Sequence, residues 1–192
     1  MDTTAIVLAG GQGSRMNFSD KAWIDFKGTP LLLHVIERVR PQVDEILISR
    51  NSTHPNYETL PFRKFADAQI SNGHQGPLSG IAACHPAVTT MFTLVVPCDT
   101  PNLPEDLVSR LASRLTDKDV VVASDRSRDH YLVFLARTSV LGSISDHLGR
   151  GQRSVKSWLE TVNYTRHEFA DTDNPFLNIN EPGQLNARSA PK

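Results

Sequence analysis

Short apolar runs, several of them rich in Val and Ile, alternate along this 192-residue chain with segments whose apolar positions follow a helical period. Runs of this kind that end in turn residues favour buried strands, and the stretches between them are long enough for crossover helices. The pattern predicts an α/β fold: one three-layer domain, residues 1–192, with a mostly parallel, Rossmann-like central sheet. The expected strands are 5–8, 45–49, 62–66, 92–96, 120–123, 131–135 and 163–168.

Prolines mark the starts of three of the expected helices. Pro30, Pro77 and Pro104 each precede a segment of helical periodicity, and each sits at a first-turn position where its missing N–H group costs nothing. No internal repeat, low-complexity tract or linker interrupts the alternation. The expected helices are 31–39, 78–85, 104–115, 138–148 and 155–161, with a short closing helix at 182–187.

The loop that follows the first expected strand, Leu8-Ala9-Gly10-Gly11-Gln12-Gly13-Ser14-Arg15-Met16, is the most informative segment of the chain. Glycines have no Cβ atom, so consecutive backbone N–H groups can approach phosphate oxygens closely. The glycines alone would equally fit a plain turn. Arg15 and Lys21 add positive charge beside them, and this shifts the balance toward a site for a nucleoside triphosphate.

Two familiar phosphate-binding loops do not fit the spacing. A dinucleotide fingerprint needs a third glycine where this sequence has Met16. A P-loop needs Gly-Lys-Ser/Thr, but Lys21 lies between Asp20 and Ala22. Dehydrogenases and adenylate kinases are therefore less favoured than an enzyme that rearranges the bonds of a triphosphate.

Polar residues follow three further expected strands. Asn51 follows the second strand, Asp67 the third, and Asp99 the fourth, between two prolines. Ligands of open α/β sheets bind beyond the carboxyl ends of the strands, so these side chains should converge. Asp99 could hold Mg²⁺ against phosphate oxygens. All three residues also suit ordinary turns, in which the side chain accepts from nearby N–H groups.

Charge and cysteine content exclude several classes of partner. Lys and Arg number 20 against 21 Asp and Glu, so no overall positive field favours nucleic acid or an anionic membrane. Cys84 and Cys98 form no close pair, which indicates buried thiols and a reducing compartment, the cytoplasm. We therefore expect a cytoplasmic enzyme without nucleic-acid or membrane partners.

The motifs resemble molybdenum cofactor guanylyltransferase, a family of the nucleotidyltransferase superfamily. The resemblance runs in the family's order from Leu8 to Asn180 and covers nearly the whole chain. The glycine loop is shared by the superfamily, whereas the Pro-Cys-Asp block together with the late asparagines is more selective. The matching blocks are Leu8 to Met16, Asp20-Lys21, Gly28-Thr29-Pro30-Leu31, Gly76-Pro77-Leu78-Ser79-Gly80, Pro97-Cys98-Asp99-Thr100-Pro101 and Phe176-Leu177-Asn178-Ile179-Asn180.

The resemblance implies a nucleotide-binding half, 1–115, and a pterin-cofactor-binding half, 116–192. It implies transfer of GMP from GTP to molybdenum-molybdopterin with release of pyrophosphate, Mg²⁺ as cofactor, and transient contacts with molybdoenzymes or their chaperones. By motif match, GTP would be bound by Leu8, Ala9, Gly10, Gly11, Lys21, Asn51, Asp67 and Asp99, Mg²⁺ by Asp99, and the pterin partner by Arg153, Asn178 and Asn180.

A reaction of this type needs no general base, because a terminal phosphate is largely ionised at neutral pH, its second pKa being about 6. Catalysis then depends on alignment and on neutralisation of charge, which Arg15, Lys21 and Asp99 with its metal would supply.

Two other functions compete with guanylyl transfer. A related enzyme could transfer a cytidylyl group to the pterin or a nucleotidyl group to another phosphorylated substrate, although that sister group resembles Leu-Ala-Ala-Gly where this chain has Leu-Ala-Gly-Gly. A non-catalytic carrier of the molybdenum cofactor is the other alternative. Arg15, Lys21 and Asp99 together favour catalysis over a carrier.

Overall fold

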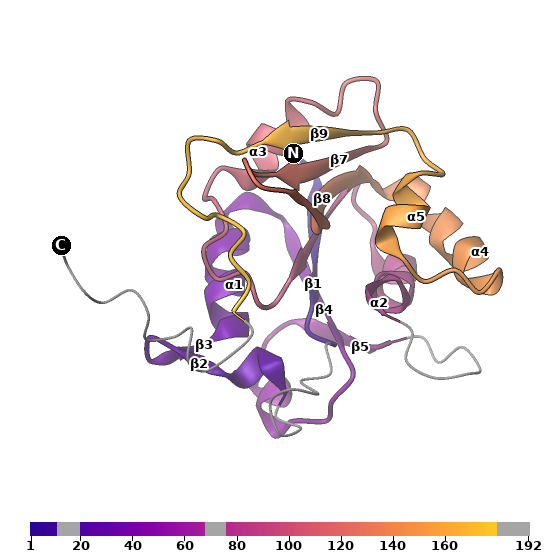
Figure 1. Cartoon of the computed structure of the whole chain (residues 1–192). Coiled ribbons are helices and arrows are strands. Elements are labelled where there is room, and N and C mark those ends of the chain that lie inside the picture. The colour runs from indigo at the N-terminus through magenta and orange to yellow at the C-terminus, as the bar shows by residue number, and fades with distance from the viewer. Residues whose placement is uncertain (11–19, 68–75, 180–192) are drawn as a thin grey trace.

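The computed structural model describes residues 1–10, 20–67 and 76–179. A seven-stranded sheet in the order β5-β4-β1-β6-β8-β7-β9 forms its centre (Figure 1). The strands are β1 Thr3–Leu8, β4 Glu45–Arg50, β5 Arg63–Ala66, β6 Phe92–Pro97, β7 Val120–Ser124, β8 Asp129–Arg137 and β9 Tyr164–Glu168.

Helices cover both faces of this sheet because successive strand side chains point to opposite sides. Ala5 and Val7 of β1 pack in one apolar cluster with α1 (Leu31–Val39) and α3 (Leu107–Ala112). Ile6 and Leu8 pack in a second cluster with the helices on the other face. Those helices are α2 Pro77–Cys84, α4 Ser143–Gly149 and α5 Val155–Leu159, which lie together on one side of the sheet in Figure 1. The predicted three-layer α/β arrangement is confirmed.

The sheet is mostly parallel, as predicted, but β8 is not. β1 pairs in parallel with β4 and β6, β4 with β5, and β7 with β9. β8 pairs antiparallel with both β6 and β7. The connection from Ser124 to Asp129 is too short for a crossover, so β7 and β8 can only form a hairpin.

Several predicted boundaries differ from the observed ones. The segment expected as a helix at 104–115 is helical only over α3, since turns occupy the residues before and after it. The segment 138–148 begins as a 3-10 turn, Thr138–Gly142, before α4. A small hairpin of β2 (Asp25–Phe26) and β3 (Thr29–Pro30) was not expected. The closing helix expected at 182–187 lies outside the described residues.

Both cysteines are buried and form no disulfide, as expected. Burial raises the pKa of the Cys84 thiol to about 12, and burial also raises the pKa of Cys98. Both side chains are therefore neutral packing groups at physiological pH. Within the described part of the chain, no helix is both long and apolar enough to cross a bilayer.

Candidate active site

The carboxyl ends of β1, β4 and β6 meet at one edge of the sheet, and backbone hydrogen bonds continue just beyond them. The Ala9 N–H group donates to the Ser49 carbonyl at 2.8 Å, and the Cys98 N–H group donates to the Leu8 carbonyl at 3.0 Å. These bonds fix the start of the loop at residue 9 against the residue that precedes Asp99. The polar residues predicted to converge at this edge are therefore held together by the sheet itself.

Lys21 and Asp99 form the central ion pair of the site. Lys21 begins a 3-10 turn, Lys21–Trp23, that is capped by the Asp20 carboxylate, which accepts from the Ala22 N–H group at 3.1 Å. The Lys21 Nζ atom lies 2.5 Å from Asp99 Oδ2, and the two side chains are only 16% and 13% exposed. Residues 78 positions apart in the sequence thus place opposite charges in one partly buried position.

The second carboxylate oxygen of Asp99 is suited to a cation. Asp99 Oδ1 is buried and accepts no hydrogen bond from any residue that the structure describes. Mg²⁺ is commonly held by one or two carboxylates together with substrate phosphates rather than by a cage of protein ligands. The described residues contain no group of three or more His, Cys, Asp or Glu side chains placed to bind a metal. The Asp99 Oδ1 atom is therefore compatible with the role of a single carboxylate ligand of such an ion.

Gly10, Asn51 and Asp67 lie against one another, as the edge argument predicts. The Asn51 amide donates to the Gly10 carbonyl at 2.5 Å. A Cβ atom at Gly10 would lie 2.9 Å from Asn51 Nδ2 and 3.0 Å from Asp67 Oδ2. A residue other than glycine at this position would therefore force the Asn51 side chain to shift and would press against Asp67.

Two buried serines hold the Asp67 carboxylate. Ser49 Oγ donates to Asp67 Oδ1 at 2.5 Å, and Ser79 Oγ lies 3.4 Å from Asp67 Oδ2 while donating to the Gly76 carbonyl at 2.7 Å. Neither Ser49 nor Ser79 was predicted from the sequence to be a member of the site. The sequence signal that could have identified them is the position of a polar residue: Ser49 lies near the end of an apolar strand, and Ser79 lies in the first turn of a helix.

The C-terminal half returns to the same place. The Ile179 N–H group donates to the Asp99 carbonyl at 3.0 Å, so Asn178 lies next to a residue bonded to Asp99. A Cβ atom at Gly76 would lie 3.6 Å from the Arg153 carbonyl oxygen, which places the Arg153 backbone beside the start of α2. Of the predicted site residues, Gly11, Arg15 and Asn180 lie outside the described residues.

A polar hollow of about 550 Å³ opens at the carboxyl ends of β7 and β9. Asp125 on its wall accepts from the Ser127 N–H group at 2.7 Å and lies 2.6 Å from His130 Nε2. Burial would raise the pKa of Asp125, but the hydrogen bonds from Ser127, His130 and Arg128 outweigh burial and hold that pKa well below its usual range. The basic residues that line the hollow are Arg114, Arg126, Arg128, Arg166 and His167.

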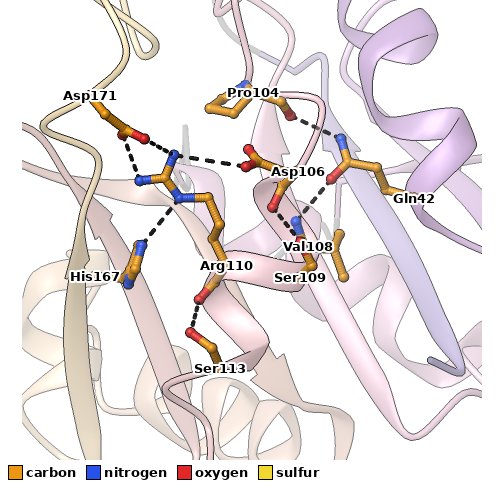
Figure 2. Close-up of polar contacts among 9 residues, drawn as sticks. All are labelled: Gln42, Pro104, Asp106, Val108, Ser109, Arg110, Ser113, His167 and Asp171. Atoms are coloured by element: carbon orange, nitrogen blue, oxygen red, sulfur yellow. Dashed lines mark hydrogen bonds and ion pairs between the residues drawn. The ribbon is translucent and has the colours of Figure 1, made fainter.

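Arg110 joins this region to α3 (Figure 2). Its guanidinium group donates to both oxygens of Asp171, at 3.2 and 2.7 Å, and through Nε to His167 Nε2 at 3.4 Å. Because Arg110 can only donate, His167 accepts as a neutral ring with its proton on Nδ1. Burial, followed by the charges of Arg110 and Arg114, lowers the pKa of His167, whereas Asp171 and Asp106 act in the opposite direction.

The fold is one that solved nucleotidyltransferases share. Molybdopterin-guanine dinucleotide biosynthesis protein A from Archaeoglobus fulgidus superposes on this chain with a TM-score of 0.76 at 20% identity, covering 95% of this chain and 94% of the other. The 4-diphosphocytidyl-2C-methyl-D-erythritol synthase from Anaerococcus prevotii gives 0.75 at 12% identity, covering 96% and 92%. At these identities the likeness shows the fold alone.

Residues 5–168 match the MobA-like NTP transferase domain, and the chain belongs to this family. A molybdenum cofactor guanylyltransferase from Shewanella pealeana is 38% identical over 182 residues, which cover 94% of this chain and 90% of the relative. A protein of the same name from Shewanella halifaxensis is 37% identical over the same length. The resemblance drawn from the motifs is confirmed, and the chain is a nucleotidyltransferase.

Gly80 provides a test of the Asp67 environment. A Cβ atom at Gly80 would lie 2.3 Å from Ser49 Oγ and 3.1 Å from Asp67 Oδ1, so Gly80→Ala must push the Ser49 hydroxyl off the carboxylate. We expect the free energy of unfolding, measured by urea denaturation, to fall by about 1–3 kcal/mol. Gly149→Ala is the matched control, because nothing lies within 4 Å of its added methyl group. Equal stability of the two variants would show that Ser49 is free to move.

His167 predicts an acid-side loss of stability. In the folded protein its pKa is lowered, whereas the unfolded chain takes up the proton at about pH 6.5. The unfolded state therefore binds more protons as pH falls below that value, and stability drops until pH passes the lowered folded pKa. Urea midpoints measured from pH 7.5 to 5 should fall more steeply for wild type than for His167→Gln, whose amide oxygen can still accept from Arg110. Parallel curves would contradict this role.

Proposed function

We propose that this chain transfers GMP from GTP to molybdenum-molybdopterin, giving the guanine dinucleotide form of the cofactor and pyrophosphate. The observation that carries the proposal is the pairing of Lys21 with Asp99 at the carboxyl ends of β1 and β6, in a chain whose curated relatives named above are molybdenum cofactor guanylyltransferases.

The nucleotide would lie over the loops after β1, β4 and β5. The start of the glycine loop supplies backbone groups around Leu8, Ala9 and Gly10, with Gly11 beyond them. Asn51 and Asp67 stand against Gly10. Guanine presents N1–H and N2–H₂ donors on one edge, and a carboxylate accepts from both. Ser49 orients the Asp67 carboxylate by bonding Oδ1.

In the reaction, a phosphate oxygen of the pterin partner forms a bond to the α-phosphorus of GTP. The bond from that phosphorus to the bridging oxygen of the β-phosphate breaks, and pyrophosphate leaves. No proton has to be removed from the attacking phosphate at neutral pH. Lys21 neutralises charge that builds up on the phosphoryl oxygens, and Arg15 would add to it. Asp99 would hold Mg²⁺, which would supply Lewis-acid stabilisation of the charge on the same oxygens.

The second substrate would approach from the C-terminal half. Asn178 precedes Ile179, which is bonded to Asp99, so it would contact the second substrate there, and Asn180 would add a further contact. Arg153, exposed beside Gly76, offers a cation for the phosphate of the pterin partner. The two substrates would then meet at Asp99, which both halves contact. We expect the protein to act in the cytoplasm, where GTP is available.

Asp99→Asn tests the reaction and the metal together. The substitution keeps the size of the side chain but removes the charge that would hold Mg²⁺, and a group of this kind is worth roughly 10²–10³ in rate. With GTP, Mg²⁺ and molybdenum-molybdopterin, we expect wild type to form the dinucleotide and this variant to turn over roughly 10²–10³ times more slowly. Glu105→Gln, on a side chain 79% exposed, should match wild type. Unchanged pyrophosphate release from the Asp99 variant would exclude the metal role, and a preference of wild type for CTP would favour cytidylyl transfer.

Asp67→Asn tests the choice of base. The amide of the variant presents a donor where one carboxylate oxygen accepted, so the loss of charge-assisted bonds should weaken GTP binding by about 1.5–3 kcal/mol. Inosine triphosphate lacks the N2 amino group, so it should bind wild type more weakly than GTP and lose less affinity on mutation. Titration calorimetry with GTP, inosine triphosphate and pyrophosphate measures all three. Asp117→Asn is the control, on a carboxylate 75% exposed. Parallel losses for all ligands would mean that Asp67 does not contact the base.

A further inference from the structure

The segment 169–179, which leads from β9 back to Asp99, has backbone anchors at both ends. The Phe169 N–H group donates to the Ser124 carbonyl at 2.8 Å, at the carboxyl end of β7. The Ile179 N–H group donates to the Asp99 carbonyl at 3.0 Å, and a turn bond from Leu177 to Asn174 at 3.3 Å lies between. The segment forms no regular element, so side chains must contribute to its placement.

Arg110 contacts two residues of this segment, Asp171 and Phe169. It bonds both oxygens of Asp171, and its guanidinium carbon lies 4.1 Å from the centre of the Phe169 ring. The Arg110 side chain is only 20% exposed, whereas Asp171 is 71% exposed. A planar guanidinium group can form a bidentate pair and stack on an aromatic ring at once, which an ammonium group cannot do.

Aromatic contacts continue from Phe169 toward the site. The Phe169 and Phe176 rings pack edge to face with centroids 5.2 Å apart, and the Phe176 ring lies 4.7 Å from the His130 ring. Both phenylalanines are buried. Phe176 is two residues before Asn178, so the position of the Phe169 ring bears on where Asn178 lies.

The helix that carries Arg110 is itself fixed near Asp99. α3 follows the loop that begins at Asp99. The side chain of its N-cap residue, Asp106, forms no capping hydrogen bond. Gln42 caps the helix instead: its Oε1 atom accepts from the Val108 N–H group at 2.9 Å, and its Nε2 atom donates to the Pro104 carbonyl at 2.9 Å (Figure 2). Arg110 therefore ties the segment to a helix whose start is held in place.

We infer that Arg110 is a positioning residue for the second substrate: by clamping Asp171 and Phe169 it holds the segment 169–179 so that Asn178 stands at Asp99. This inference rests on the proposed function. Apart from Asp99, whose backbone carbonyl rather than its carboxylate is bonded to this segment, the proposed nucleotide contacts would lie on the loops after β1, β4 and β5. Arg110 contacts none of the described residues of those three loops. Its loss should therefore reduce use of the pterin substrate and spare GTP.

The test compares Arg110→Ala with two other variants. Arg110→Lys keeps the positive charge but cannot form the bidentate pair with Asp171, and Arg38→Ala serves as the control. Arg38 is the matched control, since it pairs with Glu105 just before α3 but does not contact the segment. We expect Arg110→Ala to raise the KM for molybdenum-molybdopterin roughly tenfold, with kcat at saturation and GTP affinity close to wild type. Arg110→Lys should lie between the two, and Arg38→Ala should match wild type.

Hydrogen exchange gives a readout that does not depend on the reaction. The Ile179 amide reports directly on the bond to Asp99, so in Arg110→Ala it should exchange faster, while amides of β1 keep their protection. Asp171→Ala, a change at an exposed side chain, should show the same shift and covers the case in which Arg110→Ala fails to fold. Unchanged exchange at Ile179 would overturn the inference, as would an equal loss of GTP affinity or of protection in β1. Absence of transfer by wild type would instead contradict the proposed function, and exchange at Ile179 would still decide the role of Arg110.

Discussion

The ion pair between Lys21 and Asp99 is the interaction on which the site depends. It joins the turn after the glycine loop to the loop after β6, and both side chains are largely removed from water. A charge held in such a place is costly without its partner, so each group constrains the other. The carbonyl of the same aspartate accepts from Ile179, so one residue is bonded to both halves of the chain through different atoms.

The neighbouring carboxylate, Asp67, is held by a different principle. In the described part of the chain, the Ser49 hydroxyl donates to Asp67 Oδ1, and the Ser79 hydroxyl, which donates to the Gly76 carbonyl, lies 3.4 Å from Asp67 Oδ2. Hydroxyl donors fix the direction of the carboxylate without cancelling its charge, which leaves acceptor strength for a ligand. The close approach of Gly10 and Gly80 to these side chains leaves no room for a Cβ atom at either position. Asp99 is thus paired with a charge, whereas the side-chain partners of the Asp67 carboxylate among residues 1–10, 20–67 and 76–179 are neutral hydroxyls.

The sequence predicted those parts of the fold and site that follow from strand geometry. Every strand of the main sheet lies within two residues of its expected bounds. The rule that ligands bind beyond the carboxyl ends of strands placed Asn51, Asp67 and Asp99 at one edge, and in the structure Asn51 and Asp67 both lie against Gly10. The reversed direction of β8 needed the observation that its connection to β7 is too short to cross over. Ser49 and Ser79 were missed because a buried serine is indistinguishable in sequence from a tolerated core residue. The Arg110–Asp171 pair joins residues 61 positions apart, and neither lies in a motif.

The antiparallel strand β8 explains how the N-terminal and C-terminal halves of the chain reach the same edge of the sheet. β6 and β7 both run opposite to β8, so they run parallel to each other, and β9 follows β7. Two reversals restore the direction, and the carboxyl ends of β7 and β9 therefore emerge on the same side as those of β1, β4 and β6. The chain can therefore leave β9 and return to Asp99 within the short segment 169–179, which Arg110 contacts at Phe169 and Asp171. A single reversal would have sent β9 to the opposite edge, and Asn178 would have had to cross the full length of the sheet to reach the site.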